Sequence, residues 1–109
     1  RRSSDLDAVL ATKPTAVFAA NDEMAIGLYR GLAERGVKVP DDISVVGFDG
    51  IDLDRYVTPQ LTTVAQPIEE LGEKASALLL TRISNPQAPT QQISLPVELV
   101  VRSSTAAVK

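Results

Sequence analysis

Three polar side chains each follow a short apolar run in this chain, and their types suit the binding of a small molecule. Asn21 follows TAVFAA, Asp49 follows ISVVGF and Gln66 follows LTTVA. One carboxylate and two carboxamides offer hydrogen-bond donors and acceptors together, which matches the hydroxyl and amino groups of a metabolite. Phosphate is usually held by Arg, Lys or glycine-rich loops instead. The three residues therefore favour a ligand rich in hydroxyl or amino groups.

The apolar runs before these residues are predicted to be parallel strands. Strands joined through a helix almost always form right-handed parallel crossovers, so their carboxyl ends lie at one edge of the sheet. Open α/β sheets bind their ligands at that edge. We therefore expect an α/β fold in which Asn21, Asp49 and Gln66 converge. The predicted strands cover residues 15–20, 43–48 and 61–65.

Helices are predicted between and beside these strands. Asn21 can cap a helix that runs to Arg35, where Gly36 suits a left-handed stop. Pro67 is expected at the first position of another helix, since its missing N–H costs nothing there. The remaining elements are a first helix over 5–11, one helical turn near 52–56 and an extended tail over 93–102.

Each of the three polar residues also has an ordinary structural explanation. Asn21 can be explained by helix capping alone. Asp49 can be explained by a hydrogen bond to its own backbone in a turn with Gly50. Gln66 can be a solvated residue before a helix that begins with proline. The residues alone leave these alternatives open.

Composition restricts the classes of protein to which this chain can belong. Its 109 residues suit one domain, and 44% hydrophobic with 23% charged residues is typical of a globular protein. No apolar stretch of about 20 residues and no secretory leader is visible, so we expect no membrane partner. The net charge of -3 and the scattered basic residues argue against direct binding to a nucleic-acid backbone. The absence of Cys is compatible with a cytoplasmic protein.

Catalytic and metal-binding patterns find little support. Without His and Cys, neither a Ser-His nor a Cys-His arrangement can be built. No glycine-rich nucleotide motif is present, and the acids of FDGIDLD lack the spacing of a calcium loop. We therefore expect no metal and no cofactor. We do not expect an enzyme, although catalysis by carboxylates alone stays open.

The predicted helix after Asn21 carries more apolar surface than one face of a sheet requires. Its apolar stripe widens to an arc of roughly 200°. The surplus can meet a second chain, or it can meet the third helix and the tail. The residues of this arc are Met24, Ala25, Ile26, Leu28, Tyr29, Leu32 and Ala33.

Four sequence blocks in order resemble the LacI/GalR family of bacterial transcription regulators. The blocks are FAANDEMAIGLYRGLAERGVKVPDDISVVGFDG, YVTPQLTTVAQP, LGEKA and LVVRSST, and the similarity runs from about Pro14 to Thr105. They resemble the carboxyl-terminal lobe of the family's effector-binding core. The resemblance implies a type I periplasmic-binding-protein-like lobe, a three-layer α/β sandwich around a mainly parallel sheet. Residues 1–109 are then expected to form one lobe, with the DNA-binding head and most of the other lobe outside this chain.

The resemblance also implies roles for single residues. Effectors of the family, usually sugars, nucleosides or other small metabolites, bind in the cleft between two lobes. By the family pattern, Asn21 and Asp49 contact the effector. Gln66 is a less regular contact, and Phe48 lies close to the cleft. The chain departs from the family at Gly50, where many members have a second acid or amide.

Two segments are implied at the family's dimer interface, namely the helix after Asn21 and the connection before the third strand. The expected function is that of an effector-sensing, homodimer-forming lobe of a cytoplasmic repressor, which meets operator DNA only through the missing helix-turn-helix domain. A lobe of an extracytoplasmic sugar-binding protein that serves transport is the alternative. The residues implied at the dimer interface are Ile26, Tyr29, Arg30, Ala33, Asp52, Arg55, Tyr56 and Val57.

Overall fold

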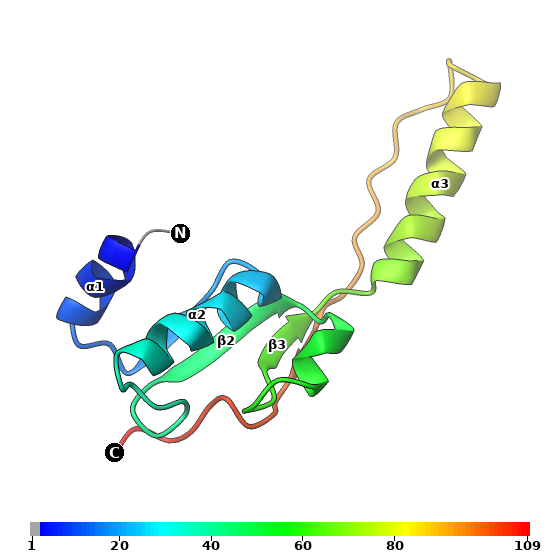
Figure 1. The fold of residues 1–109 in the computed structure, drawn as a ribbon. Helices are drawn as coiled ribbons and strands as arrows, with labels where there is room; N and C mark the ends of the chain where they lie inside the picture. The colour runs from blue at the N-terminus through cyan, green and yellow to red at the C-terminus, as the bar shows by residue number, and fades with distance from the viewer. Residues whose placement is uncertain (1–2) are drawn as a thin grey trace. The chain divides into compact units, whose positions relative to one another are not determined.

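The computed structural model describes residues 3–109, which form two compact units (Figure 1). The first unit extends to Ala65 and includes Glu98–Lys109, and the second unit is Gln66–Val97. Each unit has its own internal structure, and the single lobe expected over 1–109 stays a prediction. None of the helices within residues 3–109 combines the length and the apolar character that crossing a membrane requires.

The first unit is built on a four-stranded sheet. Its strands are β1 (Ala16–Phe18), β2 (Ser44–Asp49), β3 (Thr62–Ala65) and β4 (Glu98–Val100). They lie in the order β1-β2-β3-β4, in which the first three are parallel and β4 is antiparallel to β3. This confirms the mainly parallel sheet of the predicted α/β fold. Of the extended tail predicted over 93–102, three residues join the sheet as β4.

Helix α2 (Asp22–Glu34) begins where the sequence predicts a cap. The Asn21 side chain accepts a hydrogen bond from the Met24 N–H at 2.8 Å, which satisfies one free donor of the first turn. The helix ends before Gly36, whose φ of 68° is a left-handed conformation that glycine adopts without a Cβ penalty. Local sequence therefore determines both ends of α2.

Figure 1 shows α2 lying along the sheet, and residues of both contribute to the hydrophobic core. Complete burial of one Leu or Ile side chain contributes about 1.5–3 kcal/mol, so a few such residues hold the helix in place. Helix α1 (Ser3–Ala11) adds the half-buried Leu6 and Leu10 to this core. The buried residues of the core are Ala19, Ala25, Leu32, Ile43, Val45 and Leu61.

The connection between β2 and β3 contains the single helical turn that the sequence predicts. This turn is the 3₁₀ helix η1 (Asp52–Arg55). The Asp54 N–H donates to the Ile51 carbonyl at 3.1 Å, and the Leu61 N–H donates to the Asp54 carbonyl at 2.9 Å. These bonds tie η1 to the chain that enters β3.

The second unit consists of α3 (Ile68–Ser84) and the chain that follows it to Val97. The predicted helix is confirmed, but the position expected for Pro67 is wrong. Pro67 flanks the helix instead of starting it, because its ψ of 71° lies outside the helical range. Its carbonyl already accepts the first helical hydrogen bond, from the Leu71 N–H at 2.8 Å.

Candidate functional site

The carboxyl ends of the parallel strands bring Asn21 and Asp49 to one edge of the sheet. Asp49 is the last residue of β2, and it pairs with Ala65, the last residue of β3. Past the end of β1, the Ala19 N–H donates to the Val46 carbonyl at 2.8 Å, so the chain follows the sheet almost to Asn21. Asn21 and Asp49 are both half-buried. The geometry thus gives a polar edge at the place where open α/β sheets bind ligands.

The backbone of Asp49 has a conformation that L-residues rarely adopt. Its φ is 136°, and the next residue, Gly50, has a φ of 84°. A non-glycine residue in such a region costs about 1–3 kcal/mol and persists only where the surrounding structure maintains it. We call this pair of residues the Asp49–Gly50 corner.

Glycine is the residue that fits at position 50. A Cβ there would come within 2.7 Å of the Ala65 Cβ, and the positive φ would add strain. The departure from the family pattern at Gly50 therefore has a physical reason in this chain. An acid or amide side chain at this position would require either Ala65 or the backbone at position 50 to shift.

The other two residues expected at the site are arranged differently. Phe48 precedes Asp49 on β2, pairs with Val64 and has a half-buried side chain. Gln66 directly follows β3 in the chain but belongs to the second unit, where its carbonyl accepts from the Ile68 N–H at 2.9 Å. The roles of Phe48 and Gln66 toward an effector stay predictions.

Sequence reasoning missed Asp22, which holds the Asp49–Gly50 corner in place. This carboxylate is fully buried, and it accepts hydrogen bonds from the Gly50 N–H at 2.8 Å and the Ile51 N–H at 3.0 Å. Its other oxygen accepts from the Thr63 hydroxyl at 2.6 Å. The sequence indicated only that an acid at the start of α2 suits the helix dipole. No local pattern signals its distant partners.

A second buried acid, Asp54 of η1, was also missed. Its side chain is completely buried, and Arg102 Nη1 lies 3.7 Å from Asp54 Oδ2. The Arg102 guanidinium also donates to the Leu61 carbonyl at 2.7 Å. Burial, the hydrogen bond with Asp22 and the negative charge of Asp22 raise the pKa of Asp54 to about 7. This carboxyl is therefore largely protonated below neutral pH.

The residues implied at a dimer interface lie on α2 and on the segment around η1. The two segments are joined by a hydrogen bond from the Tyr29 hydroxyl to the Pro59 carbonyl at 2.9 Å. Part of the apolar surplus of α2 is used inside the chain, since Ile26 and Tyr29 pack against the core together with Val57. The exposed members of the set are Arg30, Ala33, Asp52, Arg55 and Tyr56.

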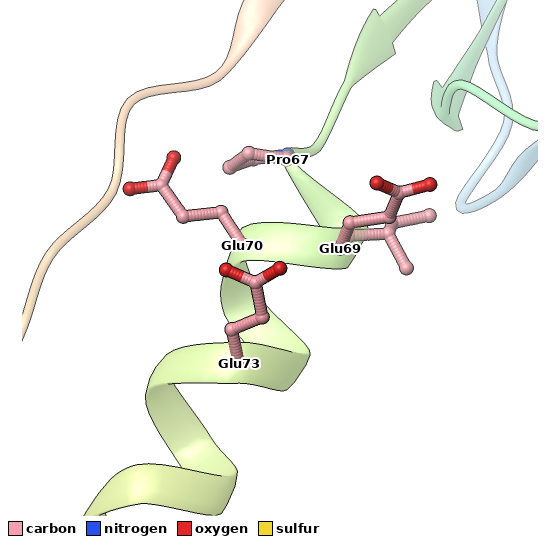
Figure 2. Close-up of a pocket in the computed structure, with 5 residues that line it drawn as sticks. Pro67, Glu69, Glu70 and Glu73 are labelled. Carbon is pink, nitrogen blue, oxygen red and sulfur yellow. The ribbon is translucent and has the colours of Figure 1, made fainter.

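An open hollow of about 540 Å³ lies at the start of α3, within the second unit (Figure 2). It is lined by Pro67, Ile68, Glu69, Glu70 and Glu73. Figure 2 shows the three carboxylates pointing apart instead of toward a common centre. Within residues 3–109, no group of three or more acids is arranged to hold a metal ion.

Comparison with known proteins gives the family. Residues 1–105 match the periplasmic binding protein-like domain. The chain is 44% identical over 95 residues to the probable HTH-type transcriptional repressor ExuR of Bacillus subtilis. It is 42% identical over 102 residues to the HTH-type transcriptional repressor PurR of Vibrio campbellii. These alignments cover 87% and 94% of this chain but 28% and 30% of the repressors, so the chain spans less than a third of their length.

A solved structure agrees with the sequence matches. A LacI family transcriptional regulator from Enterococcus faecalis V583, determined with bound ribose, superposes with a TM-score of 0.91 at 48% identity. The similarity covers 98% of this chain and 40% of that protein. By its sequence and its fold, the chain belongs to the periplasmic binding protein-like domain family, in the form found in LacI-family transcriptional regulators.

Proposed function

We propose that this chain is the effector-sensing and dimer-forming lobe of a LacI/GalR-type transcriptional regulator that binds a sugar or nucleoside. The observation that carries the proposal is the polar edge of the sheet. There Asp49 is held in a rare backbone conformation, with φ 136°, on the same edge as the capping Asn21. Strain of this kind clusters at functional sites, because a rigid scaffold maintains it for binding.

The similar proteins support a regulator over a transport receptor. ExuR and PurR are repressors, and the similar Enterococcus structure has ribose bound. The hydroxyls of a sugar match the donors and acceptors of one carboxylate and two carboxamides. We therefore assign Asn21 and Asp49 as direct effector contacts, Gln66 as a third contact and Phe48 as a residue near the cleft.

The proposed mechanism is a shift between two arrangements of two lobes. An effector that bridges the lobes stabilises the arrangement to which it binds more tightly. A homodimer would transmit that change to a helix-turn-helix domain outside this chain, which contacts operator DNA. The protein would work in the cytoplasm, where its DNA is, and it would bind its effector without chemical conversion.

The test is the effector response of the full-length protein with Asp49→Ala. We expect the affinity of the wild-type protein for its operator fragment to change when ribose, another sugar or a nucleoside is added. The variant should bind the fragment as before but lose at least tenfold in effector affinity, which is about 1.4 kcal/mol. Fluorescence anisotropy of the labelled fragment measures both quantities. Asp41→Ala is the matched control, since Asp41 is an exposed carboxylate before β2.

Two results would contradict this proposal. An unchanged effector response in Asp49→Ala would reduce Asp49 to a turn residue and remove the basis of the site. Tight sugar binding by a full-length protein that binds no DNA would favour the transport receptor.

A further inference from the structure

Two buried carboxyl groups contact each other, and one of them is hydrogen-bonded to the Asp49–Gly50 corner. Asp22, from the start of α2, and Asp54, from η1, are both completely inaccessible to solvent. Two ionised carboxylates in contact repel each other strongly, and the repulsion grows where water is excluded. A single proton between them converts the repulsion into a hydrogen bond. The surroundings of the two acids determine which of them carries that proton.

The surroundings of Asp22 favour its ionised form. Its two oxygens accept from the Thr63 hydroxyl at 2.6 Å and from the Gly50 and Ile51 N–H groups at 2.8 and 3.0 Å. It also lies in the first turn of α2, at the positive end of the helix dipole. Burial pushes the pKa of Asp22 upward, but the hydrogen bonds from Asp54, Thr63, Ile51 and Gly50 outweigh it and leave this pKa below its ordinary value. Asp22 therefore acts as an acceptor.

The surroundings of Asp54 favour its protonated form. Among residues 3–109, neither oxygen of its carboxyl accepts a hydrogen bond from a protein donor. Arg102 Nη1 is 3.7 Å away, at ion-pair distance, and its hydrogen bond goes to the Leu61 carbonyl instead. A buried carboxylate without donors is costly, whereas a carboxylic acid can donate its own proton to Asp22.

We propose that Asp54 carries a proton that it donates to Asp22, and that this acid pair positions the Asp49–Gly50 corner. The connection is direct, because Asp22 Oδ2 accepts from both Gly50 and Ile51. The Asp54 backbone in turn bonds to the Ile51 carbonyl. Both Asp22 and Asp54 are positioning residues. Their effect on effector binding rests on the proposed function, whereas the sharing of a proton between them is independent of that function.

Ionisation of Asp54 would load the pair with a second negative charge. The charged and titratable groups that face Asp54 are Asp22 and Tyr29 from α2, Asp49 from β2 and Arg102 beyond β4. Of these groups, only Arg102 carries a positive charge, which stabilises an ionised Asp54. The corner should therefore loosen as the pH rises through about 7, where Asp54 loses its proton.

The sign of the pH effect on stability follows from the same proton. The pKa of Asp54 is about 7 in the folded chain, against an ordinary value of 3.8. The stabilisation from this proton is therefore complete below pH 3.8, and it is lost as the pH rises to about 7.

The experiment compares Asp54→Asn with Asp22→Asn in the full-length protein. The two variants make the same chemical change on the two sides of one contact. An amide at position 54 still donates to Asp22, so this variant should keep the corner and lose the titration. An amide at position 22 cannot serve as the all-acceptor partner of Asp54, Thr63 and the two N–H groups, so this variant should loosen the corner at every pH.

The readout is NMR of the aspartate carboxyl carbons and of the Gly50 and Ile51 amide protons. We expect one carboxyl signal, absent from Asp54→Asn, to titrate near pH 7. In the wild type, the chemical shifts of both amide protons should change with the same midpoint. In Asp54→Asn, these shifts should show no midpoint near pH 7. The Tm of the wild type should also fall relative to that of Asp54→Asn as the pH rises from about 5 to about 8.

Several results would overturn the pair. The proposal would be contradicted if the Asp54 carboxyl signal titrated with the ordinary aspartate pKa. It would also be contradicted if the amide-proton shifts of Gly50 and Ile51 did not change as Asp54 titrates. Equal losses of stability in both variants would also contradict it. If Asp22→Asn does not fold, the wild-type titration and its loss in Asp54→Asn still decide the question.

Effector binding separates this proposal from the proposed function. For ribose, or another sugar or nucleoside that the protein binds, wild-type affinity should weaken severalfold between about pH 6 and about pH 8, while the affinity of Asp54→Asn stays constant. A pH-dependent affinity shared by both proteins would mean that the pair does not position the corner. If no metabolite binds, the proposed function fails, and the NMR titration still tests the shared proton.

Discussion

At the scale of single residues, Asn21 illustrates how one side chain can serve both the fold and a binding site. Its oxygen caps α2 by accepting from the Met24 N–H at 2.8 Å. A hydroxyl performs this capping equally well, but it lacks the two N–H donors of a carboxamide. The structural role and the effector role of Asn21 can therefore be separated by the choice of substitution.

Asn21→Ser is expected to keep the fold and weaken the site. Because Ser caps helices about as well as Asn, the free energy of unfolding should stay within about 0.5 kcal/mol of wild type. Asn21→Ala should lose about 1 kcal/mol, since the cap is gone. Both variants should bind effector more weakly by a similar factor. Urea unfolding and calorimetric titration measure the two effects, and full affinity in Asn21→Ser would make Asn21 a cap alone.

At the scale of elements, a close approach between β2 and α2 restricts the residues that fit. A Cβ on Gly47 would overlap the Asp22 carboxylate at the start of α2. Thr63, which pairs with Gly47 across β2 and β3, donates its hydroxyl to the same carboxylate. The helix and the sheet are therefore joined by a buried polar contact as well as by the apolar core.

Gly47→Ala is expected to destabilise the first unit by about 1–3 kcal/mol, because the added methyl must displace Asp22. Effector affinity should fall as well, since Asp22 holds the Asp49–Gly50 corner. Gly27→Ala is the matched control, because a Cβ at that position in α2 meets open space. It should stabilise the protein by about 0.5–1 kcal/mol. Urea unfolding measures the stability of both variants. Equal stability would contradict the close approach of β2 and α2 at Gly47 and Asp22.

At the scale of the whole molecule, the residues implied at a dimer interface differ in what they already contact. Ile26, Tyr29 and Val57 pack against the chain's own core, so they are only partly available. Tyr56 is 74% exposed, and the Arg55 guanidinium lies 5.9 Å from its ring centre. Exposed aromatic and Arg side chains are the types that carry most of the binding energy at protein interfaces. Tyr56 is therefore the sharpest test of the proposed dimer.

Tyr56→Glu is expected to weaken the homodimer at least tenfold, about 1.4 kcal/mol, without changing the fold. The added charge would have to be buried beside its symmetry mate near a twofold axis. Sedimentation equilibrium of the full-length protein measures the dissociation constant. Gln91→Glu, which adds the same charge at an exposed position of the second unit, should leave the constant unchanged. An unaltered dimer in Tyr56→Glu would contradict the implied interface.

The sequence by itself determined the elements and the polar edge. Asn21 and Gly36 marked the ends of α2, because a cap and a left-handed stop depend on residues within one turn. The apolar runs predicted the strands, and the fixed hand of parallel crossovers predicted that Asn21 and Asp49 share an edge. The motif blocks predicted the family, which the comparisons then confirmed.

Only the tertiary structure decided the surroundings of the buried acids. Asp22 bonds to Gly50 and Thr63, which lie 28 and 41 residues away along the chain. The need for glycine at position 50 depends on Ala65, and the raised pKa of Asp54 depends on burial beside Asp22. Periodicity and caps report contacts among neighbours in sequence. Protonation and close approach depend instead on which distant atoms the fold brings to within about 3 Å, and on how completely it excludes water there.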